Sequence, residues 1–235
     1  MSSQGRDIYP ESQRWLIFAI LMGVGGFYGA FTYTIRGGVF CNAQTANFVL
    51  FAMALGDGLW KKALYYLIPM SAYFLGAFLS EAANTAQRQR WPIRWETALV
   101  GVEMLVVVLL GLLPETAPYQ ISQVIINFIC SMQYNTFRAA EGVPMATTFC
   151  TNHLRQTGIA CYMALRTRDH SYVQRCVRHL GMLGVFVLGG VISTALCRHF
   201  LGRAVWAALV PLAYVFADLL RADLRERRDK VQAAQ

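Results

Sequence analysis

Two short segments carry most of the side chains that could bind a solute, and both lie in strongly apolar sequence. The first reads CNAQTANF over residues 41–48, and the second reads TTFCTNHLRQ over residues 147–156. Their amides and hydroxyls offer hydrogen-bond donors and acceptors without net charge, which suits a small polar solute or an ion held by oxygen atoms. The candidate binding residues are Asn42, Gln44, Thr45, Asn47, Gln133, Asn135, Thr148, Thr151, Asn152, His153 and Arg155.

The same side chains have a purely structural alternative. Amides and hydroxyls also hydrogen-bond between transmembrane helices, and each such bond contributes about 0.6 to 2 kcal/mol. On that interpretation the protein is a scaffold or a sensor, and the two segments hold its helices together. A transporter should keep a polar, water-accessible cavity between the segments, whereas a scaffold should be dry there with every amide paired to protein.

Three titratable or charged side chains could add chemistry to this neutral set. Arg155 follows the second segment and could bind an anionic solute through its fork of donors. Glu103 lies in the run ALVGVEMLVVVLL and is a proton-coupling candidate, because a carboxylate buried there must find a partner or take a proton. His153 could relay protons near neutral pH. Glu103 and His153 also have a structural interpretation, as groups that hydrogen-bond to neighbouring helices.

Other reactive residue types indicate less. Arg138 and Glu141 are three residues apart and could form an ion pair at the end of a span. His170, His179 and His199 lie among loop arginines, and we interpret them as interfacial. The 6 cysteines have no CxxC spacing and are interpreted as small apolar fillers, so neither a disulfide framework nor a metal site is expected. No GxxxxGK[ST], HExxH or GxSxG motif occurs, which argues against an ATP-driven motor and an enzyme and indicates no cofactor.

The elements that must position these residues are membrane helices. The chain is 56% hydrophobic and 14% charged, whereas a soluble domain carries about 25% charged residues. Several apolar runs approach the roughly 20 residues that cross a hydrocarbon core. The first run lacks the features of a signal peptide, so we expect it to remain in the protein. The runs are 15–34, 63–80, 97–113, 119–132, 180–197 and 204–220.

The net charge of +8 does not indicate a nucleic-acid partner. The 21 Lys and Arg residues cluster in short segments between the apolar runs, such as 88–94 and 166–178, and in the basic tail 221–235. This distribution is typical of cytoplasmic loops. Such a tail also contacts anionic lipid headgroups. The expected partners are therefore the lipid bilayer and a small-molecule or ion solute.

A shift of about 106 residues aligns the chain with itself. It brings FYGAF at 27–31 onto QYNTF at 133–137, and it places Thr45 on Thr151. Each half then reads as an apolar span, a short polar segment and two more spans. This order predicts two repeats, over about 14–113 and 119–220.

The polar segments 39–56 and 145–163 decide the topology. If both dip into the bilayer and return, most basic residues lie on one side, and the loop PETAPY at 114–119, which has none, lies on the other. If both crossed fully, the chain would have eight spans and a weaker charge bias. An odd number of crossings in each repeat inverts the second half, which is the plan of many secondary transporters. We therefore expect the two segments to meet as halves of one site.

Two longer stretches carry a resemblance to a known family. FCNAQTANFVLFAMALGDG at 40–58 and MQYNTFRAAEGVPMATTFCTNHLR at 132–155 are similar to the paired QTGN-type and TGNLR-type motifs of the YoaK-like family of small bacterial membrane proteins. The motif glycine is Ala46 in the first segment and Asn152 in the second, and the Asn that follows it in the second is His153. The resemblance therefore does not imply the close backbone approach that glycine allows. The resemblance implies a multi-pass protein of the bacterial cytoplasmic membrane and no particular activity.

The sequence thus predicts an all-α integral membrane protein with six transmembrane helices, two re-entrant segments, two inverted repeats and both termini in the cytoplasm. Its predicted function is that of a secondary transporter or facilitator of a small polar or anionic solute, with the scaffold or sensor as the alternative. Small residues recur at helix-packing spacing, Gly25 with Gly29 and Ala72 with Gly76. They let helices approach closely, either within the chain or across a homodimer.

Overall fold

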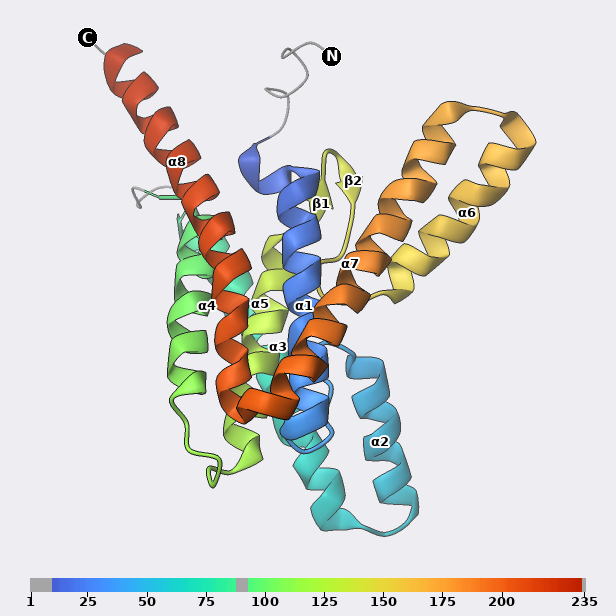
Figure 1. Ribbon diagram of the computed structural model, residues 1–235, viewed down its shortest axis with the longest axis vertical. Helices are drawn as coiled ribbons and strands as arrows, with labels where there is room; N and C mark the ends of the chain where they lie inside the picture. Colours follow the sequence, from blue (N-terminus) through green and yellow to red (C-terminus); the bar gives the residue numbers. More distant parts are fainter. Residues whose placement is uncertain (1–9, 88–92, 234–235) are drawn as a thin grey trace.

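The computed structural model describes residues 10–87 and 93–233, and nearly all of them are helical (Figure 1). Residues 88–92 of the basic loop expected at 88–94 lie outside the described residues. Each apolar run coincides largely with one long helix, which confirms the all-α prediction. The helices are α1 (Trp15–Ile35), α2 (Gln44–Gly56), α3 (Trp60–Gln87), α4 (Trp95–Gly111), α5 (Tyr119–Thr136), α6 (Thr151–Thr167), α7 (His170–Phe200) and α8 (Leu209–Ala233).

Short elements connect these helices. The 3-10 helix η2 (Glu11–Gln13) precedes α1, and the 3-10 helix η3 (Leu201–Ala208) joins α7 to α8. A small antiparallel hairpin of β1 (Ala139–Ala140) and β2 (Val143–Pro144) follows α5. Sequence patterns gave no sign of this hairpin, because strands of two residues are too short to show alternation.

Within the described residues, three helical segments are long and apolar enough to cross a membrane: Trp15–Ile35, Trp60–Ala86 and His170–Ala233. The third is not straight, because Leu201 has a φ of 49° and the chain reverses there, so that α7 and α8 run in opposite directions (Figure 1). Large apolar side chains such as Phe74 and Phe78 on α3 are exposed. These features fit a membrane protein.

The long helices pack in pairs around α1 and α5. Helix α1 packs against α7 and α3 packs against α5, while α4 packs against α8 and η3. The short helices lie on the outside, α2 against α3 and α6 against α7. Figure 1 shows that α2 and α6 both begin near the middle of the long axis and run toward opposite ends. Neither short helix extends along the whole length of the molecule.

Glycines allow the closest helix contacts. A Cβ atom added at Gly26 of α1 would overlap the carbonyl of Phe186 on α7, and one added at Gly189 would overlap the carbonyl of Gly23. At the α3–α5 interface a Cβ atom at Gly76 would overlap Ser131. Backbone atoms of neighbouring helices therefore touch at these points, as small residues permit in membrane bundles.

Buried and partly buried ion pairs hold the two ends of the bundle. Arg36, at the end of α1, is 2% exposed and donates to Glu115 in the α4–α5 loop at 3.1 Å. The same carboxylate accepts from the backbone N–H of Gly202 in η3 at 2.7 Å. The Glu115 carboxylate therefore links the end of α1, the α4–α5 loop and η3 at this end of the bundle.

The opposite end corrects one prediction from the sequence. Arg138 and Glu141 do not pair with each other: Arg138 pairs with Glu81 of α3, and Glu141 pairs with Arg178 of α7 at 2.8 Å. The reason is the hairpin turn, in which Glu141 has a φ of 47°. The carboxylate consequently points back toward the start of α1, where it also accepts from the backbone N–H of Trp15 at 3.4 Å.

Candidate functional site

Both polar segments fold as a loop that leads into the first turn of a short helix. Helix α2 begins at Gln44 after Ala43, and α6 begins at Thr151 after Cys150. Neither preceding residue forms a side-chain cap hydrogen bond. Since the first N–H groups of a helix have no intrahelical partner, each segment presents backbone donors at its helix start.

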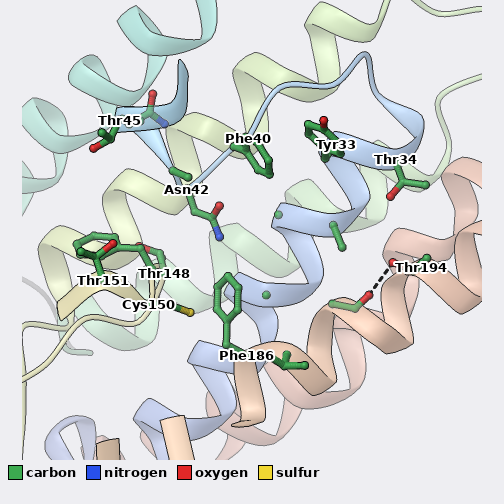
Figure 2. Close-up of a pocket in the computed structure, with 18 of the residues that line it drawn as sticks. Tyr33, Thr34, Phe40, Asn42, Thr45, Thr148, Cys150, Thr151, Phe186 and Thr194 are labelled. Atoms are coloured by element: carbon green, nitrogen blue, oxygen red, sulfur yellow. Dashed lines mark hydrogen bonds between the residues drawn. The ribbon is translucent and has the colours of Figure 1, made fainter. Parts of the chain in front are cut away.

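The two helix starts line one cavity of about 780 Å³ (Figure 2). Its wall combines residues of α1, α2, α6 and α7 with the two loops, and it includes Tyr73 of α3. Within the described part of the chain, no Asp, Glu, Lys, Arg or His side chain lines it. Sequence reasoning placed five of these lining residues in the site: Asn42, Gln44, Thr45, Thr148 and Thr151.

Helix α1 is the surface on which both segments rest. A Cβ atom added at Gly29 would lie 3.0 Å from the Asn42 amide nitrogen, and one added at Gly25 would lie 2.7 Å from the Thr147 carbonyl oxygen. Asn42 also donates from Nδ2 to the Gly25 carbonyl at 3.0 Å. The close approach expected at Gly25 and Gly29 therefore occurs within the chain.

The amides of the first segment bond mainly to protein. The Asn47 side chain is 0% exposed; its Oδ1 accepts from the Phe40 N–H at 3.2 Å, and its Nδ2 donates to the Phe40 carbonyl at 2.6 Å. Gln44 donates to Asn127 of α5 at 2.8 Å and to the Cys41 carbonyl at 3.2 Å. These bonds fix the loop before α2. Asn47 does not line the cavity.

The hydroxyls of the second segment have fewer partners. Thr147 and Thr148 are both 0% exposed. The Thr148 hydroxyl interacts with the hydroxyl of Tyr73 on α3, and both residues line the cavity. Among the described residues, the Thr147 Oγ1 atom has no hydrogen-bond partner, and Thr147 does not line the cavity. An unpaired buried polar group costs about 1–3 kcal/mol.

His153 lies behind the cavity, between α6 and α7. Its Nε2 is 2.9 Å from the Ala146 carbonyl oxygen, and its Nδ1 is 3.0 Å from Nδ1 of His179. Because a carbonyl only accepts, Nε2 of His153 carries the proton and its Nδ1 accepts from His179. His179, predicted to lie at the interface among loop arginines, lies within α7 and is 0% exposed, because α7 already begins at His170 and packs on α6 there.

Gln133 and Asn135 also lie outside the cavity lining. Gln133 is 0% exposed and donates to the Leu21 carbonyl of α1 at 3.4 Å. Asn135 donates to Glu81 of α3 at 3.1 Å, near the end of α5. Both amides therefore connect α5 to a neighbouring helix.

Asn152 and Arg155 do not line the cavity. Arg155 is exposed and donates to Asn152 at 3.1 Å. Asn152 lines a smaller neighbouring pocket of about 310 Å³ together with Arg138, and this pocket shares Phe149 with the cavity. A third pocket of about 430 Å³ shares Gly190 with the cavity and contains Arg198.

Comparison with known proteins places this architecture in a family. A family model described as "Protein of unknown function (DUF1275)" matches residues 17–217. The chain belongs to the DUF1275 family. The match runs from α1 into α8 and includes both polar segments. Comparisons with curated proteins and with solved structures found no match. The resemblance to the YoaK-like family stays a prediction.

A buried carboxyl distinguishes the centre of this DUF1275 protein. Glu103 of α4 is 0% exposed, and in the described part of the chain neither of its oxygens has a hydrogen-bond partner. The buried Tyr28 hydroxyl of α1 interacts electrostatically with this carboxyl. Glu103 does not line the cavity, but Tyr28 precedes Gly29, which does.

Sequence reasoning missed the aromatic part of the cavity in this DUF1275 chain. Tyr33 of α1 stacks on Phe40 with ring centroids 4.4 Å apart. Figure 2 shows both rings on the cavity wall, with Phe186 of α7 nearby. The sequence of a membrane helix does not show whether an apolar side chain faces lipid or a cavity. The available signals were the paired glycines at 25–26 and 189–190, which lie on the two helices that meet here.

Proposed function

We propose that this protein is a secondary transporter or facilitator of a small polar or anionic solute, with its site where α2 and α6 begin. One observation carries the proposal: two polar segments far apart in the sequence line one cavity of about 780 Å³, and both short helices begin near the middle of the long axis (Figure 1). Solute sites formed near the membrane midplane by broken helices are a recurring feature of secondary transporters.

Helix packing supports two inverted repeats. If α1–α4 are matched with α5–α8, the α1–α7 contact corresponds to the α5–α3 contact, and the α2–α3 contact corresponds to the α6–α7 contact. Helices α2 and α6 run in opposite directions (Figure 1). In this proposal α1, α3, α4, α5, α7 and α8 cross the membrane, and α2 and α6 belong to re-entrant segments.

The orientation follows from the positive-inside rule. Helix α1 begins, α8 ends and the α6–α7 turn lies at one end of the molecule, while the α4–α5 loop lies at the other (Figure 1). The first end carries Arg166 and Arg168, and the loop PETAPY has no basic residue. The proposal therefore places both termini in the cytoplasm of a bacterial cell and the protein in its inner membrane.

Glu103 is the proton-coupling residue of this proposal. It is buried without a hydrogen-bond partner among the described residues, and an intramembrane carboxyl of this kind is a functional candidate. Tyr28 connects it to α1, the helix on which both polar segments rest. Tyr28 precedes Gly29, which lines the cavity, and this is the connection that the proposal uses between Glu103 and the solute site.

The scaffold is the second candidate, and a specific observation favours it. Asn47, Gln44 and Gln133 hydrogen-bond to protein atoms, as ties between helices would. The cavity favours the transporter.

Cysteine accessibility separates the two candidates. In a background with the native cysteines replaced, Thr45→Cys and Thr151→Cys should react in membranes with a water-soluble thiosulfonate reagent. Phe78→Cys, on the exposed apolar face of α3, is the control and should not react. If neither cavity cysteine reacted, the cavity would be closed to water, and the scaffold would replace the transporter. Thr116→Cys, in the α4–α5 loop, should react from the periplasmic side.

Flux then tests transport itself. A thermal-shift screen of small solutes finds a ligand, because binding stabilises by mass action, and uptake of that ligand is measured in proteoliposomes. Gly190 lines the cavity, and a Cβ atom there would fit without a clash, with its nearest neighbour at 3.6 Å. Gly190→Leu should therefore be tolerated by the fold and block uptake by filling the cavity. Gly184→Leu is the matched control on the same helix, at a position with no atom within 4 Å.

A further inference from the structure

We infer that Cys161 of α6 and Cys176 of α7 form a redox site, at which glutathione disulfide or a similar small disulfide oxidises the two thiols to a disulfide bond. Neither cysteine lines the solute cavity, so the site lies outside the proposed function. Sequence patterns did not indicate it, because the two cysteines lie 15 residues apart and only the fold of the hairpin brings them together.

The two thiols meet across the α6–α7 hairpin. Their Sγ atoms are 2.8 Å apart, and both thiols are free. Helices α6 and α7 pack against each other, and the turn between them is short, since α6 ends at Thr167 and α7 begins at His170. The pair is therefore held together by the hairpin, and a disulfide bond needs only a small further approach of the sulfur atoms.

The two thiols differ in their access to solvent. Cys161 is exposed, whereas Cys176 is 8% exposed. Thiol–disulfide exchange begins when a thiolate attacks a disulfide sulfur, and its rate depends on access to that thiol. Cys161 is therefore the attacking thiol, and Cys176 resolves the mixed disulfide from inside the hairpin.

A second thiol pair in the chain has proximity without access. The Sγ atoms of Cys41 and Cys130 are 3.7 Å apart, and both residues are 0% exposed. A water-soluble disulfide does not reach either of them. This pair is the internal control for the reaction at Cys161.

The exposed thiol lies at the cytoplasmic interface in the orientation proposed above. Figure 1 shows that α6 runs from the middle of the long axis toward the end at which the termini lie. Cys161 is ten residues beyond Thr151, where α6 begins, and this separation is a rise of about 15 Å. Since half of the hydrocarbon core is also about 15 Å, a disulfide dissolved in the cytoplasm can reach Cys161.

The charge of the hairpin suits an anionic oxidant. Arg166 and Arg168 are exposed beside the turn, and Arg175 precedes Cys176. Asp169 is the only acidic residue between Thr151 and Leu180 in the sequence. Glutathione disulfide carries net negative charge, so this basic hairpin attracts it.

The reaction balances in two exchanges. The Cys161 thiolate attacks one sulfur of glutathione disulfide, the disulfide bond of the oxidant breaks, and one glutathione leaves as a thiolate. The Cys176 thiolate then attacks Sγ of Cys161 and displaces the second glutathione. Two protein thiols are oxidised, one glutathione disulfide is reduced to two glutathione molecules, and the two protons pass to these through water. Because the cytoplasm keeps thiols reduced, the pair is open at rest and closes under oxidising conditions.

Peptide mapping of the purified full-length protein tests the inference. The protein is incubated with glutathione disulfide, blocked with N-ethylmaleimide, denatured and digested with trypsin. We expect the peptide QTGIACYMALR at 156–166 to be joined to CVR at 176–178 by a bond that dithiothreitol breaks. The maleimide adducts of both peptides should be lost, whereas Cys41 and Cys130 should be recovered as maleimide adducts.

Single variants separate the roles of the two thiols. In Cys176→Ser, Cys161 should retain one glutathione as a mixed disulfide, because no resolving thiol follows. In Cys161→Ser, Cys176 should remain free. Cys197→Ala, on the same helix as Cys176, is the matched control and should form the bond as the wild type does. Thermal unfolding verifies the fold of all three.

Three outcomes would overturn the inference. They are the absence of the linked peptide in the wild type, linkage of Cys41 to Cys130 without linkage of Cys161 to Cys176, and a glutathione adduct on Cys176 in Cys161→Ser. The wild-type result decides even if a variant fails to fold. Each of these failures leaves the proposed transport untouched, because neither thiol lines the cavity.

Discussion

The two polar segments resemble each other in composition and differ in how their polar atoms are used. In the first, Asn47 and Gln44 bond to nearby backbone and to α5. In the second, Thr148 interacts with the Tyr73 hydroxyl of α3, and the buried Thr147 hydroxyl has no hydrogen-bond partner within the described residues. Buried polar groups are usually paired, and an unpaired one needs an explanation. The comparison teaches that the amides of the first segment hold its loop firmly, whereas the hydroxyls of the second are held by fewer bonds.

The largest effect should come from removing a tie in the first segment. Asn47→Leu leaves the Phe40 N–H and carbonyl without their partner and should lower the free energy of unfolding by about 3 kcal/mol. Thr45→Ala, at an exposed position of the same helix, should change it by less than about 0.5 kcal/mol. Denaturant unfolding in detergent, followed by circular dichroism, measures both. If Asn47→Leu lowered the free energy of unfolding by less than about 1 kcal/mol, the amides of the first segment would not hold its loop as the comparison states.

The next effect compares how each segment rests on α1. Gly25→Ala should cost about 2 kcal/mol, because its Cβ meets the backbone of Thr147, which can move only with the loop. Gly29→Ala should cost less than about 1 kcal/mol, because it meets the Asn42 side chain, which can shift. Gly184→Ala, with open space around it, is the control in the same unfolding assay. Equal costs at Gly25 and Gly29 would show that both segments are held alike.

A smaller effect on stability should accompany a clear effect on binding. Thr148→Val removes a cavity-lining hydroxyl that interacts with Tyr73 and should lower the free energy of unfolding by about 1 kcal/mol, while solute affinity falls by about tenfold. Thr147→Val removes an unpaired hydroxyl, so it should leave stability unchanged or raise it by about 1 kcal/mol and leave affinity unchanged, since Thr147 does not line the cavity. Titration calorimetry of both variants gives the comparison. A loss of affinity in neither variant would mean that the hydroxyls of the second segment do not contact the solute.

The smallest effect is expected at Arg155. Arg155→Gln removes an exposed side chain whose bond is to Asn152, so unfolding free energy should change by less than about 0.5 kcal/mol and solute affinity by less than about twofold. The sequence suggested Arg155 as the countercharge of an anion, and this variant tests that role. Loss of anion binding in Arg155→Gln would restore the arginine to the site.

Much of the fold was predictable because long apolar runs have few alternatives in a membrane protein. The run expected at 119–132 became α5, which ends only at Thr136. The run expected at 180–197 became α7, which begins ten residues earlier at His170. Hydropathy does not register that beginning because it is rich in arginine and histidine, and the burial of His179 was missed for the same reason.

The candidate site was predictable in part. The internal repeat brought the two polar segments together in the prediction, and Asn42, Gln44 and Thr148 do line one cavity. Composition shows that an amide can hydrogen-bond but does not identify its partner, so Asn47 could not be distinguished from Asn42. The rings of Tyr33 and Phe186 could not be found because apolar residues that face a cavity and those that face lipid look alike in sequence.

The length of α2 has a consequence for how the protein is made. Its 13 residues rise about 20 Å, whereas the hydrocarbon core is about 30 Å thick, so α2 cannot enter the bilayer as an independent span and must follow α3. The Gln44 amide of α2 bonds to Asn127 of α5, which the ribosome has not yet synthesised when α2 and α3 emerge. During biosynthesis the first half therefore lies in the membrane with the Gln44 amide still lacking its partner on α5. We expect chains truncated before α5 to be cleared by membrane proteases.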